Sequence, residues 1–152
     1  MEPLRAIAYV SSATHLLTAD ELDRLLALSR ELNARDGISG ALLHHDGNFL
    51  QYLEGPEPAL HAVYARIRRS TLHHGLVELL DEPIAARRFE GWYMGFAQTP
   101  GSWMQAMSQA RWVGALRGLD TAAEEESPGV GLLLQFWRQS RHLAPSAGMS
   151  PA

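Results

Sequence analysis

One glutamine in an apolar stretch is the side chain that points most clearly to chemistry. In an extended segment, alternation places Gln51 on the same face as Phe49 and Leu53, with Leu50 and Tyr52 on the other face. Both faces are therefore apolar apart from Gln51. A buried amide without hydrogen-bond partners costs roughly 1–3 kcal/mol. Because this amide carries two donors and an acceptor, we expect a ligand with several polar edge groups to dock against Gln51.

Tyr9 and Asn33 are the two other polar side chains whose predicted positions bring them near Gln51. Taken singly, Tyr9 is a core tyrosine in a strand and Asn33 is a helix C-cap. The strands that carry Tyr9 and Gln51 can be neighbours, however, and the end of the first helix then lies over the same face. A phenol and two primary amides would converge there on one pocket.

The composition argues against several other kinds of chemistry. The chain has 152 residues, a net charge of −4 and 20% charged residues, so we expect no binding of nucleic acid or membranes. It contains no cysteine and no lysine, which excludes disulfides, thiolate nucleophiles and lysine Schiff bases. The histidine pairs at 44–45 and 73–74 diverge or lack neighbouring carboxylates, and we expect no metal site. Without a signal-peptide pattern or a membrane-length apolar run, we expect a cytoplasmic protein.

Hydrophobic periodicity predicts the elements that position these side chains. Thr18 begins a capping box and a helix that ends at Asn33, while Pro56 begins a second helix. Asp46-Gly47 is a hairpin signal before the strand of Gln51. Other strands are expected at 4–11, 38–43, 76–80 and 92–96. This order is the split-βαβ, ferredoxin-like α/β (α+β) arrangement with one added strand, and its two helices are expected on one sheet face.

Two further helices are expected at 102–117 and 129–142, where they would cover the other apolar face of the sheet. Their large side chains exceed what one monomer has room to bury, which predicts a homodimer or higher oligomer; these are Trp103, Met107, Trp112, Phe136 and Trp137. The alternative, that these helices only cap the core, stays open. We expect 120–129 to be a polar linker and 144–152 a disordered tail.

Several blocks of the sequence together resemble the BLUF (blue light using flavin) photoreceptor domain over residues 4–98. The blocks are Tyr9-x-Ser11, Ser29-x-x-x-Asn33-x-x-x-Gly37-Ile38-Ser39-Gly40, Asp46-Gly47-x-Phe49-Leu50-Gln51-x-Leu53-Glu54-Gly55, and Arg88 through Trp92-x-Met94. The resemblance implies that residues 1–98 bind a flavin (FAD, with FMN or riboflavin as alternatives) between two helices on one sheet face. Residues 99–143 would then form a helical extension.

The resemblance also implies roles for individual side chains. Tyr9 would give an electron and a proton to the excited flavin, and Gln51 would rotate or tautomerise to rewire the hydrogen bonds around the flavin C4 carbonyl and N5. Trp92 and Met94, alternating onto one face of the last strand, would relay the change. The expected cofactor-binding set is Tyr9, Leu25, Ser29, Asn33, Phe49, Gln51, Ile67 and His73.

The sequence departs from the family pattern after the second helix. Most members carry Asp-x-Arg-His there, with contacts to the ribityl chain and phosphate, whereas this chain has Ser70 and Leu72 in place of the acid and the arginine, followed by His73. Arg68 or Arg69 could replace the lost charge. We therefore expect the part of the site that holds the flavin ring to be intact and the part that holds the ribityl chain and phosphates, the tail end, to bind more weakly. FAD, FMN and riboflavin should then bind with similar affinities.

The sequence thus predicts a blue-light photoreceptor without enzyme activity of its own, which signals to a separate, unidentified protein. One alternative is a flavin-free interaction module derived from the same family. A second alternative is a small enzyme on a ferredoxin-like scaffold, because the fold alone implies no function.

Overall fold

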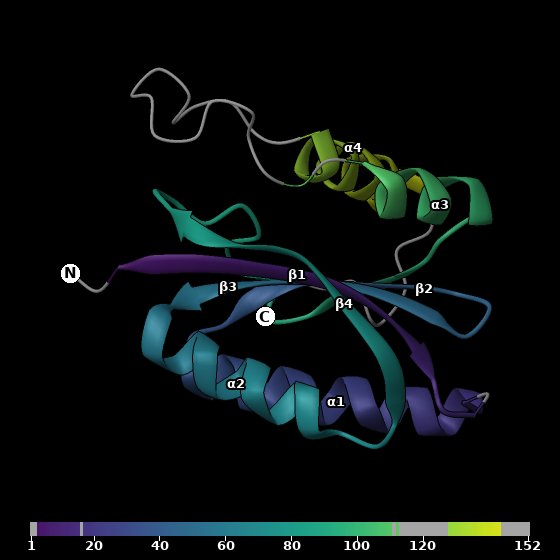
Figure 1. Ribbon diagram of the computed structural model, residues 1–152, viewed down its shortest axis with the longest axis horizontal. Helices are drawn as coiled ribbons and strands as arrows, with labels where there is room; N and C mark the ends of the chain where they lie inside the picture. Colours follow the sequence, from purple (N-terminus) through teal and green to yellow (C-terminus); the bar gives the residue numbers. More distant parts are fainter. Residues whose placement is uncertain (1–2, 16, 111, 113–127, 144–152) are drawn as a thin grey trace.

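The structure of the protein is a computed structural model that describes residues 3–15, 17–110, 112 and 128–143. Its elements follow along the chain as β1 (Leu4–Ala13), α1 (Ala19–Asp36), β2 (Ser39–His45), β3 (Asn48–Pro56), α2 (Glu57–Arg69), β4 (His73–Ile84), β5 (Gly95–Gln98), α3 (Gly101–Gln109) and α4 (Pro128–Leu143). The strands form a sheet in the order β4-β1-β3-β2-β5. Helices α1 and α2 lie on one face of this sheet, and α3 and α4 lie on the other (Figure 1). The predicted ferredoxin-like fold is confirmed.

The two strands that were expected to be neighbours pair directly. β1 and β3 are antiparallel, and Tyr9 lies opposite Gln51 in their register. The β2–β3 hairpin turns at Asp46 (φ 51°) and Gly47 (φ 83°), and two central residues with positive φ are what a tight two-residue hairpin needs. This turn fixes the register and therefore the face on which Gln51 lies.

Helix α1 begins as predicted but ends later. Thr18 and Glu21 form the reciprocal hydrogen bonds of a capping box. The helix continues past Asn33 to Asp36 and ends at Gly37, whose left-handed conformation (φ 73°) closes the last turn. The alternative interpretation of Asn33 as the helix C-cap is therefore wrong, because Gly37 supplies the cap and leaves the amide of Asn33 available for other partners.

The last strand also differs from its predicted extent. β5 begins at Gly95, whereas a strand over 92–96 was expected. A turn at Gly91 (φ 85°) precedes it, and the Trp92 amide donates to the Phe89 carbonyl within that turn. Trp92 and Met94 therefore do not alternate on one strand face. Met94 packs in the apolar cluster beneath α1 and α2, and Trp92 packs against the cluster beneath α3 and α4.

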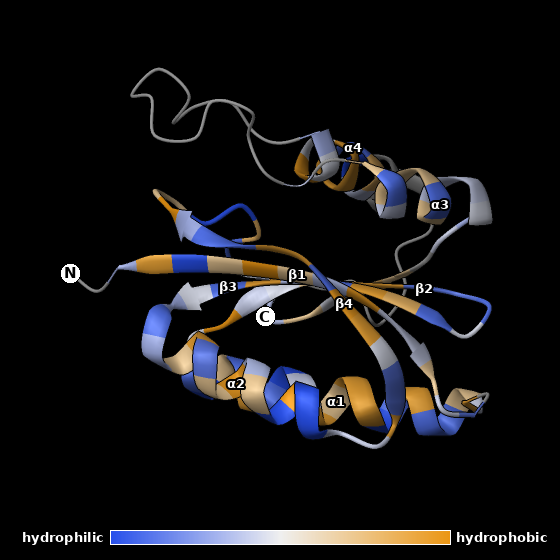
Figure 2. Ribbon diagram, viewed as in Figure 1, coloured by the Kyte–Doolittle hydropathy of each residue, from blue (hydrophilic) through white to orange (hydrophobic). Residues whose placement is uncertain are grey.

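Two apolar clusters fill the spaces above and below the sheet. Odd-numbered residues of β1 and β3, such as Ile7 and Leu53, face α1 and α2, while Ala8, Leu50 and Tyr52 face α3 and α4. In Figure 2 the strands of the middle layer carry hydrophobic segments, and the helices alternate between hydrophobic and hydrophilic residues. Such amphipathic helices on both faces account for a sheet that is apolar on both sides.

The C-terminal helices cover the second face, but they bury the side chains that suggested an oligomer. α3 ends at Gln109, within the predicted 102–117, and residues 113–127 lie outside the described part, as does the predicted tail at 144–152. The exposed fractions are 0% for Met107, 3% for Trp112, 5% for Phe136 and 4% for Trp137. The premise of an apolar excess was therefore wrong for these four side chains. The prediction of a homodimer stays untested and no longer has this support.

Candidate functional site

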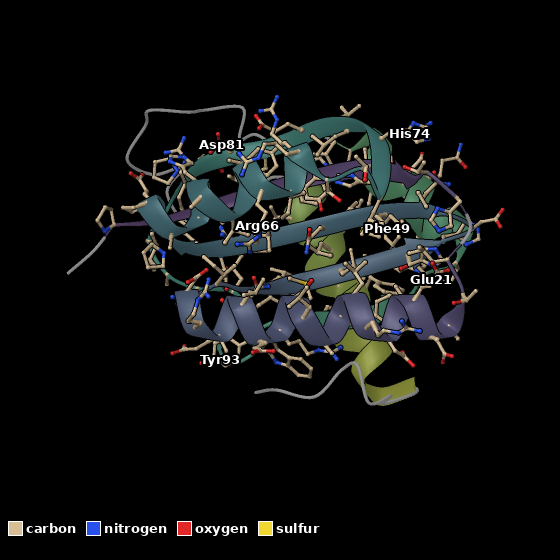
Figure 3. All side chains as sticks on the ribbon, turned by 90° about the horizontal axis from the view of Figure 1, so that it is seen from below. Glu21, Phe49, Arg66, His74, Asp81 and Tyr93 are labelled. Carbon is tan, nitrogen blue, oxygen red and sulfur yellow. The ribbon has the colours of Figure 1, made fainter. Side chains whose placement is uncertain are left out.

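A pocket of about 260 Å³ lies on the sheet face covered by α1 and α2. Figure 3 looks onto this face and shows Phe49 and Arg66 between the two helices, with Tyr93 at the outer side of α1. All the residues expected to bind a cofactor line this one pocket: Tyr9, Leu25, Ser29, Asn33, Phe49, Gln51, Ile67 and His73. They come from β1, α1, β3, α2 and the start of β4, so only the tertiary fold brings them together.

The floor of the pocket carries a chain of hydrogen bonds through Gln51. The hydroxyl of Tyr9 donates to Oε1 of Gln51, and Nε2 of Gln51 donates to the sulfur of Met94 at 3.3 Å. Tyr9, Gln51 and Met94 are 5%, 7% and 1% exposed, so water competes little for these groups. The amide still has one N–H and one oxygen lone pair to offer a ligand.

The phenol of Tyr9 is held in its neutral form. Burial, helped by the neighbouring Tyr64, raises the pKa of Tyr9 well above its usual value of 10. The two phenol rings lie 5.9 Å apart between centroids. Tyr9 therefore keeps its proton at neutral pH and can act as the donor that Gln51 requires.

Asn33 supplies a second buried amide, from α1. It is 3% exposed, and its Nδ2 donates to the Tyr93 carbonyl at 2.9 Å. The second N–H and the Oδ1 of Asn33 remain available to a ligand in the pocket. Asn33 and Gln51 thus offer both donors and acceptors from two sides of one apolar hollow.

The other end of the pocket is built by α2 and the start of β4. Nε2 of His73 donates to the Ile67 carbonyl at 2.8 Å, and its buried Nδ1 has no hydrogen-bond partner among the described residues. Arg66 lines the pocket, whereas Arg68 lies over the ring of Tyr64, 5.6 Å from its centroid. Ser70 and Leu72 line this end as well, without a charge.

Sequence reasoning missed Arg66 and chose Arg68 or Arg69 as the basic group instead. The helical repeat carried the signal, because Val63, Arg66 and Ile67 share one face of α2 at spacings of three and four residues. The same reasoning finds several other lining residues outside the expected set. Alternation or helical spacing from predicted positions leads to Ser11, Leu28, Leu42 and Leu53.

Of the two predicted relay residues, the structure places only Met94 at the site. Met94 contacts Gln51, but Trp92 lies on the opposite side of the sheet, where its ring meets that of Trp137 edge-on at 5.3 Å between centroids. The two side chains are nevertheless separated by one residue of backbone. A displacement of this short segment would affect both faces of the sheet.

The shape and chemistry of the pocket suit a flat heteroaromatic ring with polar atoms along one edge. Leu25, Phe49 and Ile67 provide apolar walls, and the amides of Asn33 and Gln51 provide the polar edge. Among the described residues no cluster of three or more potential metal ligands occurs. Within that same part of the chain, no helix is long and apolar enough to cross a membrane.

Comparison with known proteins identifies the family that shares this arrangement. A family model described as sensors of blue light using FAD, BLUF, matches residues 4–95. The photoactivated adenylate cyclase subunit beta of Euglena gracilis is 33% identical over 84 residues, which are 55% of this chain and 10% of that protein. The blue light- and temperature-regulated antirepressor BluF of Escherichia coli is 32% identical over 69 residues, or 45% of this chain and 17% of that protein.

Solved structures show the same fold. The dark-state structure of BlrB, a BLUF protein, superimposes with a TM-score of 0.68 at 26% sequence identity, covering 92% of this chain and 98% of that chain. The BlrP1 complex of Klebsiella pneumoniae gives a TM-score of 0.59 at 33% identity, covering 62% of this chain and 24% of that chain. The curated relatives named above are thus much longer than the region they share with this chain.

Proposed function

This chain belongs to the BLUF family of flavin-binding blue-light sensors, and we propose that it senses light by switching the hydrogen bonds of Tyr9 and Gln51 in the pocket between α1 and α2. The observation that supports this mechanism most strongly is the buried chain from the Tyr9 hydroxyl through Gln51 to Met94. This chain contains a hydrogen-bond donor, an amide that can rotate, and a side chain that contacts only one end of that amide.

The described residues fit a flavin. The apolar walls of Leu25, Phe49 and Ile67 would hold the ring, and Asn33 and Gln51 would bond its polar edge. Arg66 and His73 would contact more distant polar atoms of the ligand; the buried Nδ1 of His73 has no hydrogen-bond partner within the described part of the chain. When bound, the flavin supplies absorption of blue light and an excited state that accepts an electron.

Tyr9 is the electron and proton donor in this proposal. Its phenol is neutral at physiological pH because burial raises its pKa, so electron loss would be accompanied by loss of the proton. The hydrogen bond to Oε1 of Gln51 gives that proton an immediate acceptor. No other phenol donates to Gln51 among the described residues, which makes Tyr9 specific for this step.

Gln51 is the switch. Rotation of its amide by half a turn exchanges the positions of Oε1 and Nε2. Oε1 would then face the sulfur of Met94, which has no proton to donate, so the present contact between Nε2 and that sulfur would be lost. Met94 therefore distinguishes the two amide orientations, although Tyr9 can pair with either one as donor or acceptor.

The flavin form follows from the tail end of the pocket. Among the described residues, Arg66 and His73 are the only basic side chains that line it, and Ser70 and Leu72 bring no charge. We propose FAD as the cofactor, with FMN and riboflavin binding at similar affinity. The alternative of a flavin-free interaction module gains no support from this pocket, since every residue expected to bind a cofactor lines it.

Output goes to another protein in this proposal. A photoactivated adenylate cyclase and an antirepressor are among the similar proteins, so related domains occur with different outputs. We propose that the described domain passes its signal through the C-terminal helices to a partner protein.

Flavin fluorescence in donor variants tests the proposed function. Tyr9→Phe should bind flavin, lengthen its excited-state lifetime and abolish the red shift of the visible absorption bands under blue light. Tyr93→Phe is the matched control, because only the main-chain carbonyl of Tyr93 meets the site, and it should behave as the wild type. An unchanged lifetime and a normal light-induced shift in Tyr9→Phe would overturn the assignment of Tyr9 as the donor.

A further inference from the structure

Three consecutive carbonyl groups before β5 are each held by a donor from another element. The Trp92 carbonyl accepts from the Gly40 amide of β2 at 2.8 Å. The Tyr93 carbonyl accepts from Nδ2 of Asn33 at 2.9 Å, and the Met94 carbonyl accepts from Nε of Arg30 at 3.0 Å. Because these carbonyls point to α1 and β2, the segment 92–94 lies against the helix instead of extending β5.

Asn33 and Arg30 lie three positions apart on one face of α1, but they differ in their relation to the pocket. Asn33 lines the pocket, whereas Arg30 does not. Arg30 is only partly exposed and carries a permanent positive charge, and a charged donor forms a stronger hydrogen bond to a carbonyl than a neutral donor does. The helix thus grips residues 93 and 94 with one side chain that meets the ligand pocket and one that does not.

We propose that Arg30 is a positioning residue that fixes the main chain of Met94, so that changes at Gln51 and Asn33 reach α4 through the segment 92–94. This inference rests on the proposed photoswitch. We call the hydrogen bond from Arg30 to the Met94 carbonyl the clamp. Two side chains of the pocket contact the same segment: Gln51 donates to the sulfur of Met94, and Asn33 donates to the Tyr93 carbonyl. Arg30 keeps the backbone between these contacts and the following strand in one defined position.

The output side of the segment is equally close. The ring of Trp92 packs edge-on against Trp137 of α4. A Cβ atom added at Gly95 would lie 2.2 Å from the Trp137 ring, so the backbone itself abuts α4 at this point. A displacement of 92–94 would therefore act directly on α4, because the rings of Trp92 and Trp137 are in contact and the Trp137 ring also abuts the backbone at Gly95.

Hydrogen exchange in the flavin-loaded protein, in the dark and under blue light, tests the clamp. Arg30→Gln should keep the flavin spectrum and the light-induced red shift, because Arg30 does not line the pocket. In the dark it should accelerate exchange in 95–98 by about tenfold, because the strand loses its anchor. The light-induced change in exchange that we expect of the wild type in 92–98 and 128–138 should be lost.

Two variants serve as controls. Arg24→Gln removes an exposed arginine from the same helix and should match the wild type. Arg30→Lys keeps a charged donor but loses the guanidinium geometry, so it should restore only part of the light-induced change. This variant also decides the matter if Arg30→Gln does not fold. An Arg30→Lys protein whose exchange matches that of the wild type, both in the dark and under light, would contradict the need for the guanidinium at this position.

The outcomes separate this inference from the proposed function. A wild type without a light-induced red shift would contradict the proposed function itself. A wild type with that shift, together with an Arg30→Gln protein whose exchange in 92–98 and 128–138 still responds fully to light, would overturn the clamp alone. Loss of the red shift in Arg30→Gln would also overturn it, because Arg30 would then act on the pocket directly.

Discussion

The hydrogen bond between Tyr9 and Gln51 can be tested without light, through the stability of the apoprotein. Tyr9→Phe removes the hydroxyl and leaves the buried Oε1 of Gln51 without its donor. Gln51→Leu removes the acceptor and leaves the buried phenol hydroxyl unpaired. An unsatisfied buried group costs about 1–3 kcal/mol, so each single variant should lower the free energy of unfolding by roughly that amount.

The double variant distinguishes this hydrogen bond from ordinary loss of packing. Tyr9→Phe combined with Gln51→Leu removes donor and acceptor together and leaves neither group unpaired. Its destabilisation should therefore be smaller than the sum of the two single variants by about 1–2 kcal/mol. Urea unfolding of the four apoproteins, followed by circular dichroism, gives this coupling free energy directly.

A second pair on the same two strands provides the matched control. The hydroxyl of Ser12 donates to Oδ1 of Asn48 at 3.0 Å, across the same β1–β3 ladder but at an exposed position. Water replaces a lost partner there, so Ser12→Ala and Asn48→Ala should be additive within about 0.5 kcal/mol. Additivity of the Tyr9 and Gln51 variants as well would refute the reasoning, because the buried pair would then be energetically uncoupled.

Three further predictions concern the cofactor, pH and the loop before β5. Titration of the apoprotein should give dissociation constants for FAD, FMN and riboflavin that agree within about tenfold, whereas a hundredfold preference for FAD would show that Arg66 or His73 binds the phosphates strongly. Burial raises the pKa of Tyr9 and Tyr52 above 10, so the unfolded state loses these protons first as the pH rises, and the free energy of unfolding should fall above pH 10. Tyr52→Phe should reduce the slope of this fall by about 1.4 kcal/mol per pH unit. An unchanged slope would contradict the burial of this phenol. Glu54→Gln should destabilise the fold by about 2–4 kcal/mol in urea unfolding. The buried carboxylate of Glu54 accepts from the Arg88 and Phe89 amides at 2.8 and 2.7 Å and from the Ser39 hydroxyl at 2.9 Å. A change below about 0.5 kcal/mol would show that these hydrogen bonds contribute little.

Local signals in the sequence were sufficient for the elements that carry the site. The capping box at Thr18, the Asp46-Gly47 turn and the alternation around Gln51 each act over a few residues, and each was confirmed. The order of the predicted elements also indicated that the strands of Tyr9 and Gln51 could be neighbours. The pocket residues followed from these elements because helix and strand periodicities fix which side chains point inward.

Contacts between distant segments decided what the sequence did not reveal. The residues before β5 have the alternation of a strand, yet their carbonyls bond to Gly40, Asn33 and Arg30, which lie more than 50 residues earlier in the chain. Glu54 of β3 is 0% exposed, because the amides of a later loop donate to its carboxylate. Propensity and periodicity contain no information about such partners.

The C-terminal helices illustrate the same limit at the level of packing. Their aromatic side chains suggested surplus apolar surface, because the sequence does not show how much of the sheet they must cover. In the structure Phe89 and Trp92 of the preceding loop meet Trp137 edge-on, at 5.7 and 5.3 Å between ring centroids. These contacts bury the apolar surface of Trp137 that had suggested an oligomer. Burial depends on the area of the partner surface, which is a property of the fold.

The light-minus-dark absorption spectrum of the flavin-loaded protein tests the switch at Gln51 most directly. The wild type should show visible bands that move to the red under blue light and return in the dark, because the amide of Gln51 rearranges beside the flavin. Gln51→Leu should bind flavin and show no shift, while Gln105→Leu, at an exposed glutamine of α3, should shift as the wild type does. A normal, reversible red shift in Gln51→Leu would contradict the account.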